Sequence, residues 1–387
     1  MADRNSLKTL AFSIEEYQTR VEKVRLEVRK RSIDGLLIHT FPSICYLTGF
    51  QTIGSAKYFC LLVPSQGDLV LLSQDFESYN ATVSSWIENI VTYPVGGDPI
   101  RSIHKILSDH SLADKKLGIE LRSPGLKVSE FLRMKELLPS VQWVDVSDLM
   151  GAVTLIKSPS EIDIIRHAAK VSSMGMKAAI EAAAAGVTDN TIAAAAYQTL
   201  IGHGSEYMCY DPIVTVGRRS GIPHTTHRRV KVKRGDVVFM EMGACIQRYS
   251  APTMRTVFIG PPQDMPRRMA EACLGSITTV IQNAKPGVRG SEVAVKAKQA
   301  LTGLPSSIVW HGYYGYSVGI GFPPEWSDGP ASISENDPGV LQAGMVFHCS
   351  TSLRAVGQYG TTFSETIVIT SDGCEVLTDV PRELVIK

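Results

Sequence analysis

The run from Val237 to Met242 constrains the fold most, because the strand that it predicts is apolar on both faces. Val237 and Phe239 fall on one face, and Val238, Met240 and Met242 fall on the other. A strand of this kind is covered on both sides by other parts of the chain. The run therefore predicts a buried strand in a layered domain.

One carboxylate, Glu241, interrupts this apolar run. Burying an ionised carboxylate is costly unless the group is paired, hydrogen-bonded or protonated, so we expect Glu241 to have a close partner or a shifted pKa. A structural interpretation pairs Glu241 with Arg255 across a hairpin. A catalytic interpretation follows from residues 249–253 just downstream, which are typical of a pocket wall.

The length of 387 residues exceeds what one hydrophobic core usually supports, so we expect two domains. Hydrophobic residues make up 44% and charged ones 20%, as in an ordinary globular protein, and the net charge of +1 gives no sign of nucleic-acid or membrane binding. No apolar run approaches the roughly 18 residues that span a bilayer, and the start resembles no targeting peptide. We predict a cytoplasmic protein.

Seven cysteines are scattered along the chain. Their number is odd and none forms a CxxC pair, so they predict buried thiols and neither a disulfide framework nor a zinc site.

Two helix beginnings mark the two expected domains. Ser13 and Glu16 form a capping-box pattern ahead of apolar residues spaced by three and four, which predicts a helix to about residue 34. Short apolar runs at 36–38, 58–63 and 69–72 predict strands, and residues 128–138 predict another helix. This alternation favours an α/β domain, which we place at residues 1–155.

The second beginning is the capping box from Ser158 to Glu161, with Pro159 at the first helical position. It predicts an alanine-rich helix to Gly186 and, after a cap at residue 188 or 189, a helix carrying residues 192–201. From Pro212 onward strands dominate, with helices at 265–283 and 291–301 between them and final strands at 345–349 and 362–370. We place this domain at residues 156–387.

Three further features are candidate sites. His224 and His227 lie in one loop, but no HExxH pattern and no nearby acid completes a metal set. The glycine-rich run 315–321 lacks the Lys-Ser/Thr ending of a phosphate-binding loop. His348 and Glu365 each interrupt an apolar strand, where a single polar group is more often a hydrogen-bonded core residue than a catalytic one.

Taken in order, these motifs resemble those of the creatinase, prolidase and aminopeptidase P superfamily along essentially the whole chain. The motifs are the Lys157-Ser158-Pro159 linker, the Pro223-His224 loop, the acid at 241, Arg255-Thr256, the glycine turn and Gly344-Met345-Val346-Phe347. The resemblance implies a pita-bread catalytic domain of the α+β class behind the α/β N-terminal domain.

The metallopeptidases of that superfamily hold two metal ions with five side chains. Their positions fall here on Glu241, Pro252, Tyr316, Ser350 and Ser364. Proline has no ligating side chain, and neutral hydroxyls are poor substitutes for carboxylate and imidazole. The resemblance therefore implies the metal-free branch, with no cofactor and no metal ligands.

Within that branch the chain most resembles the ectoine hydrolases, through Gly315 to Gly319, Phe322 to Trp326, Phe347-His348 and the 249–256 strand. We predict a metal-independent hydrolase that opens a C–N bond in a small amidine, guanidino or amide compound. Glu241 acts as nucleophile or general base, and His224 passes the proton to the departing nitrogen. The predicted substrate contacts are Arg255, Tyr316, Ser317, His348, Glu365 and Tyr249, although Arg255 is equally suited to bracing the hairpin.

Two alternatives remain open. One is an Xaa-Pro metallopeptidase with altered ligands, and the other is a catalytically inactive pita-bread protein that binds a partner. The resemblance also implies a homodimer in which the N-terminal domain reaches the partner's site, and the loop from Gln51 to Tyr58 departs from the ectoine hydrolase pattern there.

Overall fold

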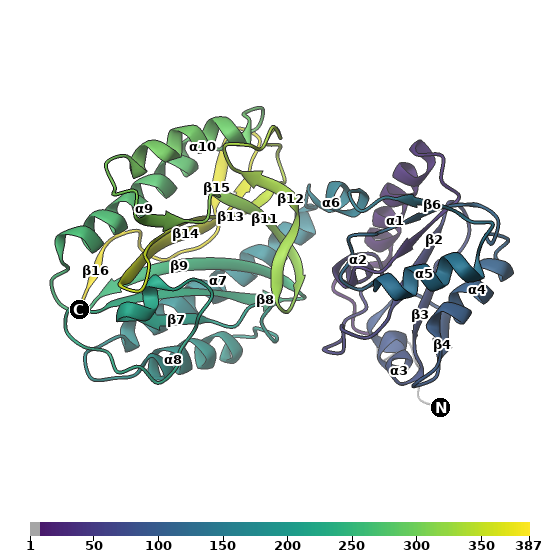
Figure 1. Ribbon diagram of the computed structural model, residues 1–387, viewed down its shortest axis with the longest axis horizontal. Helices are drawn as coiled ribbons and strands as arrows, with labels where there is room; N and C mark the ends of the chain where they lie inside the picture. Colours follow the sequence, from purple (N-terminus) through teal and green to yellow (C-terminus); the bar gives the residue numbers. More distant parts are fainter. Residues whose placement is uncertain (1–7) are drawn as a thin grey trace. The chain divides into compact units, whose positions relative to one another are not determined.

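The computed structural model describes residues 8–387, which form two compact units divided between Val153 and Thr154. The sequence placed this boundary two residues later. The division falls at the end of a short helix, α6 (Leu149–Thr154). Each unit has a sheet and helices of its own, as the predicted α/β and pita-bread classes require (Figure 1).

The smaller unit is built on a six-stranded mixed sheet in the order β4-β3-β2-β1-β5-β6. Its central strand β1 pairs antiparallel with β2 and parallel with β5. The sequence predicted strands β1, β2 and β3 and missed β4, β5 and β6. The missed strands are four residues long, and each is partly exposed or contains polar residues. The strands are β1 (Gly35–Ile38), β2 (Cys60–Pro64), β3 (Val70–Gln74), β4 (Ile90–Tyr93), β5 (Lys116–Ile119) and β6 (Gln142–Asp145).

Helices pack against this sheet, and the first one begins at its predicted cap but ends at Lys30, four residues before the predicted end near residue 34. The Ser13 hydroxyl accepts a hydrogen bond from the backbone N–H of Glu16 at 3.3 Å and begins the first helix. Its buried face carries Tyr17, Val21 and Val24. The helices are α1 (Ile14–Lys30), α2 (Phe41–Thr48), α3 (Asp75–Ser84), α4 (Pro99–Asp109) and α5 (Val128–Leu137).

The larger unit is built on a long sheet in the order β12-β11-β13-β14-β9-β8-β7. Two ten-residue strands, β8 and β9, form its central hairpin, in which Glu241 lies opposite Met254. The strands are β7 (Ile213–Val216), β8 (Val237–Ile246), β9 (Tyr249–Phe258), β10 (Ile308–Trp310), β11 (Gly315–Phe322), β12 (Glu325–Ile333), β13 (Val346–Ala355), β14 (Tyr359–Ile369), β15 (Cys374–Val376) and β16 (Val385–Ile386).

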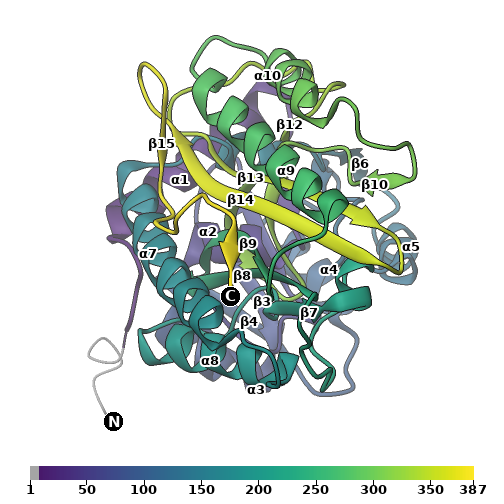
Figure 2. The ribbon, with the colours of Figure 1, turned by 90° about the vertical axis from the view of Figure 1, so that its left-hand side faces the viewer.

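Long helices cover one face of this sheet, as the turned view shows (Figure 2). Helices α7 (Pro159–Ala182) and α8 (Asp189–Gly202) pack on β8 and β9, where Val238, Met240 and Met242 join their hydrophobic cluster. Helices α9 (Asp264–Asn283) and α10 (Gly290–Lys298) pack on β13 and β14. Short 3-10 helices at η2 (Gly217–Gly221) and η3 (Gln299–Leu301) complete the unit.

The start of α7 confirms the predicted capping box. The Ser158 hydroxyl accepts the Glu161 N–H at 3.2 Å, and the Glu161 carboxylate accepts the Ser158 N–H at 2.9 Å. The helix ends at Ala182, four residues before the predicted stop at Gly186, because the chain already turns extended at Ala183. Thr188 caps α8 as expected.

Strand periodicity decides what the uncovered face of the sheet presents. Since side chains alternate along a strand, Phe239 and Glu241 point away from α7 and α8. On β13, Ser350, Ser352 and Arg354 likewise share one side. Side chains of both strands meet in the cavity described below.

Within residues 8–387 no helix is long and apolar enough to cross a membrane. The cytoplasmic location stays a prediction. All seven cysteines are free thiols, and six of them are buried.

Candidate active site

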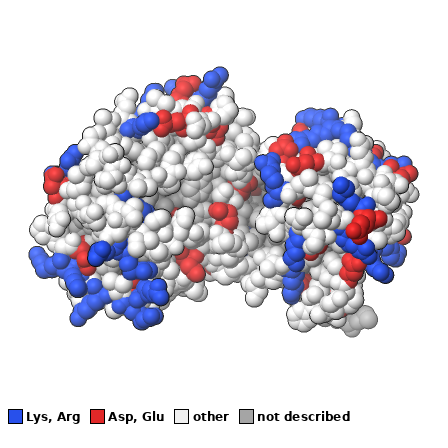
Figure 3. Space-filling view, viewed as in Figure 1, with Lys and Arg blue, Asp and Glu red and all other residues white. Residues whose placement is uncertain are grey.

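The larger unit contains a cavity of about 770 Å³ on the face of the sheet that the helices leave uncovered. Its wall is formed by side chains from β7, β8, β9, β10, β11, β12 and β13, and by the loops at 223–224 and 311–313. In the view of Figure 3 the larger unit is hollowed near its centre, and the hollow is mostly uncharged with a few acidic atoms beside it. The volume is within the range of small-molecule sites.

Glu241 lies in the cavity wall with only 8% of its surface exposed. Burial raises the pKa of its carboxyl group to about 7, against the lowering effect of the Arg354 guanidinium, and the nearby Glu325 carboxylate raises it further. The carboxyl group is thus poised between its two protonation states at neutral pH. That is the condition in which a carboxylate serves as a general base.

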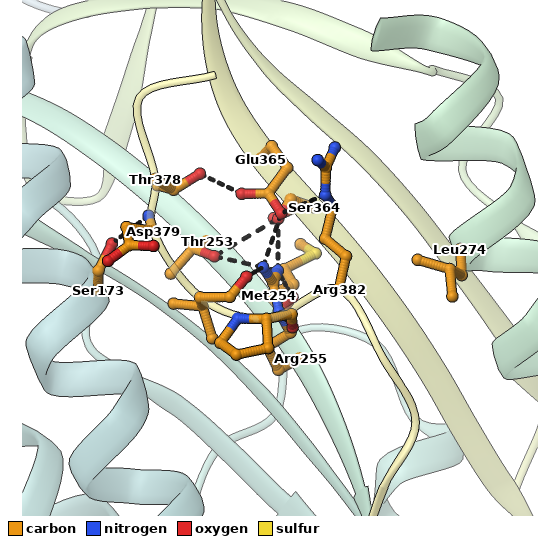
Figure 4. A network of polar contacts seen from close by, with 12 residues as sticks. Ser173, Thr253, Met254, Arg255, Leu274, Ser364, Glu365, Thr378, Asp379 and Arg382 are labelled. Carbon is orange, nitrogen blue, oxygen red and sulfur yellow. Dashed lines mark hydrogen bonds and ion pairs between the residues drawn. The ribbon is translucent and has the colours of Figure 1, made fainter. Parts of the chain in front are cut away.

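The structural interpretation that paired Glu241 with Arg255 is wrong. Arg255 neighbours Met254, the residue opposite Glu241, so its side chain points to the other face of the hairpin. There its guanidinium forms a buried ion pair with Glu365 at 2.6 Å (Figure 4). It also donates to the backbone oxygens of Met254, Ser364, Val380 and Pro381.

Arg255 and Glu365 therefore do not line the cavity, contrary to their predicted contacts with substrate. Burial raises the pKa of Glu365, and the Arg255 charge opposes that rise. Thr378 donates a short hydrogen bond to the same carboxylate. The pair braces β9, β14 and the segment 378–382, which is the alternative that the sequence left open for Arg255.

His224, the predicted proton donor, lies in the cavity wall. It stands in the exposed loop after η2 with a positive φ of 51°, a conformation that non-glycine residues seldom adopt. The pKa of His311 is lowered chiefly by burial, and the nearby His224 lowers it further. Glu241 and His224 thus share one cavity, although they are 17 residues apart in the sequence.

Tyr316 also lines the cavity, and its hydroxyl is held by two neighbours. The indole Nε1–H of Trp326 donates to it at 2.9 Å, and Nδ1 of His348 lies 2.7 Å from it. On the far side of the imidazole, Nε2 of His348 lies 2.7 Å from the Ser364 hydroxyl. His348 is fully buried behind Tyr316 and is therefore a supporting residue, not the direct substrate contact that was predicted.

Two other predicted substrate contacts belong to the scaffold. The Tyr249 hydroxyl donates to the Glu161 carboxylate at 2.8 Å, which ties β9 to the start of α7. The Ser317 hydroxyl donates to the backbone oxygen of Gly329 at 3.1 Å between β11 and β12. Both residues are buried and neither lines the cavity, because alternation turns them away from it.

Sequence reasoning missed Arg354, which brings the positive charge to the cavity that Arg255 was expected to supply. Its guanidinium lies 4.2 Å from the centre of the Phe239 ring, and it donates to the backbone oxygen of Ser220. Burial lowers the pKa of Arg354 to about 10, and the attraction of Glu241 opposes this shift. The alternation of Ser350, Ser352 and Arg354 along one strand was the available signal.

His311 and Glu325 were missed as well. The pKa of His311 is lowered to about 4, first by burial of the ring and then by the charges of Arg354 and His224, which favours the neutral imidazole. Glu325 accepts the backbone N–H groups of Trp326 and Ser327. The cavity therefore has acidic side chains on β8 and β12. It has a positively charged side chain on β13 and a histidine in each of the two loops.

Comparison with known proteins gives two family matches that together cover most of the chain. The sequence model of metallopeptidase family M24 matches residues 163–371. The model of the creatinase/prolidase N-terminal domain matches residues 20–153. The two matches fall on the larger and the smaller unit respectively.

Individual relatives span the chain from end to end. Ectoine hydrolase of Halomonas elongata is 28% identical over 403 residues, covering 98% of this chain and 99% of that protein. An Xaa-Pro dipeptidase of Pyrococcus horikoshii is 27% identical and covers 95% of this chain and 98% of its own. The crystal structure of the prolidase from the same organism superimposes with a TM-score of 0.82 at 26% identity, covering 95% of this chain and all of that one.

The side chains at the five expected metal-ligand positions do not fit a two-metal centre. They lie on adjoining strands, with Ser350 opposite Ser364 and Pro252 opposite Gly243, but Glu241 is the one carboxylate among them. Among residues 8–387 no three His, Cys, Asp or Glu side chains come together closely enough to hold a metal ion. In place of the missing ligands stand the hydroxyls of Tyr316, Ser350 and Ser364.

Proposed function

The chain belongs to metallopeptidase family M24 and is a hydrolase, and from this premise we propose that it opens a C–N bond of a small amidine, guanidino or amide compound without a metal ion. Ring opening of ectoine is the reaction that we place first. The observation that carries the proposal is Glu241, a buried carboxyl group with a pKa of about 7 in a cavity whose other metal-ligand positions hold no acid.

The charge pattern supports a small substrate with both signs of charge. An amidinium group beside Glu241 supplies the positive charge that a buried carboxylate needs, and so favours the ionised form of Glu241. The rings of Tyr210 and Trp326, whose centres lie 5.1 Å apart, make one side of the cavity wall aromatic. The guanidinium of Arg354, which lines the cavity, binds a carboxylate on the substrate through two of its N–H groups.

The reaction requires one water molecule and no redox step. Ionised Glu241 takes a proton from water as the water oxygen bonds to the amidinium carbon, or the carboxylate attacks that carbon itself and water later hydrolyses the adduct. The C–N bond then breaks while protonated His224 gives its proton to the departing nitrogen, and the proton that Glu241 took from water is passed back so that both groups are restored. For an amidine the products are an amide and a free amine.

A homodimer is part of this proposal. In the smaller unit the loop around Ile53 is anchored to α3, because the Thr52 hydroxyl donates to the Glu77 carboxylate at 2.9 Å. Ile53 is 85% exposed, and Phe76 and Tyr79 on α3 are also exposed. We propose that this apolar surface meets the partner chain and completes the partner's site.

The proposal is tested with Glu241→Gln and wild type on ectoine, creatine and Xaa-Pro dipeptides in excess chelator. We expect wild type to hydrolyse an amidine or guanidino substrate in chelator and the variant to lose about 10³-fold or more in kcat. Chelator-sensitive cleavage of Xaa-Pro dipeptides would instead establish the metallopeptidase alternative, which the dipeptidase relatives favour. Tight binding without turnover would establish the inactive alternative.

A further inference from the structure

Tyr316 stands at a position where the metallopeptidases carry a metal ligand, and its hydroxyl has an unusual pair of neighbours. The indole nitrogen of Trp326 is a donor only, so the Tyr316 oxygen must accept from it. The second neighbour, Nδ1 of His348, either carries a hydrogen and donates or lacks one and accepts. The choice decides where the phenolic hydrogen of Tyr316 points.

The Ser364 hydroxyl settles this choice. It is fully buried, and within residues 8–387 Nε2 of His348 is the hydrogen-bond partner of its oxygen. If Nε2 carried the imidazole hydrogen, the Ser364 O–H would be left as a buried donor without an acceptor, which is unfavourable. If Nδ1 carries it, Ser364 donates to Nε2 and both groups are satisfied.

The imidazole is suited to a fixed, neutral tautomer. His348 is fully buried, and burial lowers its pKa to about 3, so the ring stays uncharged at neutral pH. Burial and the nearby Glu241 charge raise the pKa of Tyr316, so its hydroxyl keeps its hydrogen. The Tyr316 oxygen then accepts hydrogen bonds from two N–H groups. Its own phenolic hydrogen therefore points into the cavity, which is the side that these two groups leave open.

We propose that Trp326 and His348 both donate to the Tyr316 oxygen, and that the Tyr316 hydroxyl therefore acts as a fixed hydrogen-bond donor to the tetrahedral adduct that forms from the substrate. This assignment rests on the proposed function. Among the four residues of this hydrogen-bonded group, Tyr316 is catalytic, because it faces the reacting group. Trp326, His348 and Ser364 are positioning residues. An amidinium nitrogen has no free lone pair, so this donor acts once water or Glu241 has added to the carbon and a nitrogen lone pair has formed, and it stabilises that tetrahedral adduct.

The hydrogen-bond half is tested without turnover. In protein labelled with ¹⁵N-histidine, the His348 signals are identified by their loss in His348→Asn. We expect one hydrogen on Nδ1, none on Nε2, and no change from pH 5 to pH 9. A hydrogen on Nε2 would mean that Tyr316 donates to His348 and not to the cavity, and it would overturn the proposal.

The catalytic half is tested by removing the hydroxyl. Tyr316→Phe should lower kcat by about 10² to 10³-fold with KM nearly unchanged. The matched control is Tyr314→Phe, since the Tyr314 hydroxyl is buried without a hydrogen-bond partner among residues 8–387 and Tyr314 does not line the cavity. This control should leave kcat unchanged.

A positioning role for His348 is separated from a structural one by two variants. His348→Asn keeps an N–H donor near the place of Nδ1 and should retain more of kcat than His348→Leu, at comparable melting temperatures. Equal kcat in Tyr316→Phe and Tyr314→Phe would overturn the catalytic role. A wild type that hydrolyses no member of the substrate panel defeats the proposed function and this catalytic role, while the Nδ1 hydrogen still decides the hydrogen-bond assignment.

Discussion

At the scale of single residues, the ionisation of Glu241 governs both activity and stability. Its pKa of about 7 places the change between acid and base forms inside the range where enzymes are assayed. The ionised form is the reactive one in either mechanism proposed for it. Two consequences follow, one for the rate and one for folding.

The first prediction concerns the rate. In the free enzyme kcat/KM should rise with pH through about 7, because protonated Glu241 can neither accept a proton from water nor attack carbon. A pH profile from 5 to 9 on the accepted substrate checks this. A profile that is flat below pH 7 would assign the base to another group.

The second prediction concerns stability. The pKa of Glu241 is raised on folding from 4.5 to about 7, so the unfavourable burial of its charge appears as pH rises between these values. Glu241→Gln should therefore be more stable than wild type by about 3 kcal/mol above pH 7, and the difference should vanish below pH 4.5. Denaturant unfolding at pH 4, 6 and 8 measures it, and a difference independent of pH would contradict it.

The third prediction separates the Arg255–Glu365 ion pair from the chemistry. Glu365→Gln leaves the buried Arg255 charge without its partner and should lower the free energy of unfolding by about 3 to 5 kcal/mol. The control is Glu375→Gln, which breaks a half-exposed pair with Arg166 and should change it by less than about 1 kcal/mol. If the folded Glu365→Gln protein lost its affinity for substrate, that result would support the predicted direct contact between Glu365 and the substrate.

At the scale of elements, the turn between β11 and β12 holds the wall that carries Glu325 and Trp326. Gly321 lies so close to β12 that an added Cβ would be 2.5 Å from the backbone oxygen of Glu325 and 2.8 Å from the Cα of Trp326. Both contacts are with backbone, which cannot move aside as a flexible side chain can. The glycine thus permits the strands to pack closely beneath the cavity.

The fourth prediction follows from that contact. Gly321→Ala should lower stability by about 1 to 3 kcal/mol and displace Trp326 from Tyr316, with a loss of kcat. Gly202→Ala is the matched control, because an added Cβ there meets nothing within 4 Å at the end of α8. It should leave stability unchanged or raise it by up to about 1 kcal/mol. Equal effects would show that close packing at Gly321 is unimportant.

At the scale of the whole molecule, the proposed homodimer makes a fifth prediction. Ile53→Asp would place a charge on the exposed loop of the smaller unit and should inactivate the partner's site, whereas Glu241→Gln inactivates the site of its own chain. Refolding or co-expressing the two inactive chains should restore up to about a quarter of the wild-type activity, from mixed dimers with one intact site. Light scattering gives the mass, and the absence of any restored activity would show that the partner supplies nothing.

Local signals in the sequence account for much of the fold. The cap at Ser13 and the capping box at Ser158 begin helices where predicted, because caps satisfy backbone groups within one helical turn and need no distant partner. The two-faced apolar run became the central strand β8, in which every residue from Val237 to Cys245 is buried, as its pattern predicts. Strands β4, β5 and β6 escaped prediction, since their pairing with distant strands outweighs a weak local pattern.

The candidate site divides along the same line. The sequence by itself determined that Glu241 is a buried acid, that His224 and Tyr316 are functional candidates and that the metal ligands are replaced, because these depend on residue identity and order. Only the tertiary structure decided that Arg255 forms an ion pair with Glu365 and that Arg354 lines the cavity. The physical reason is that a side chain's partner depends on which face of the sheet it occupies and on which distant strands cross there, and neither is encoded at the residue itself.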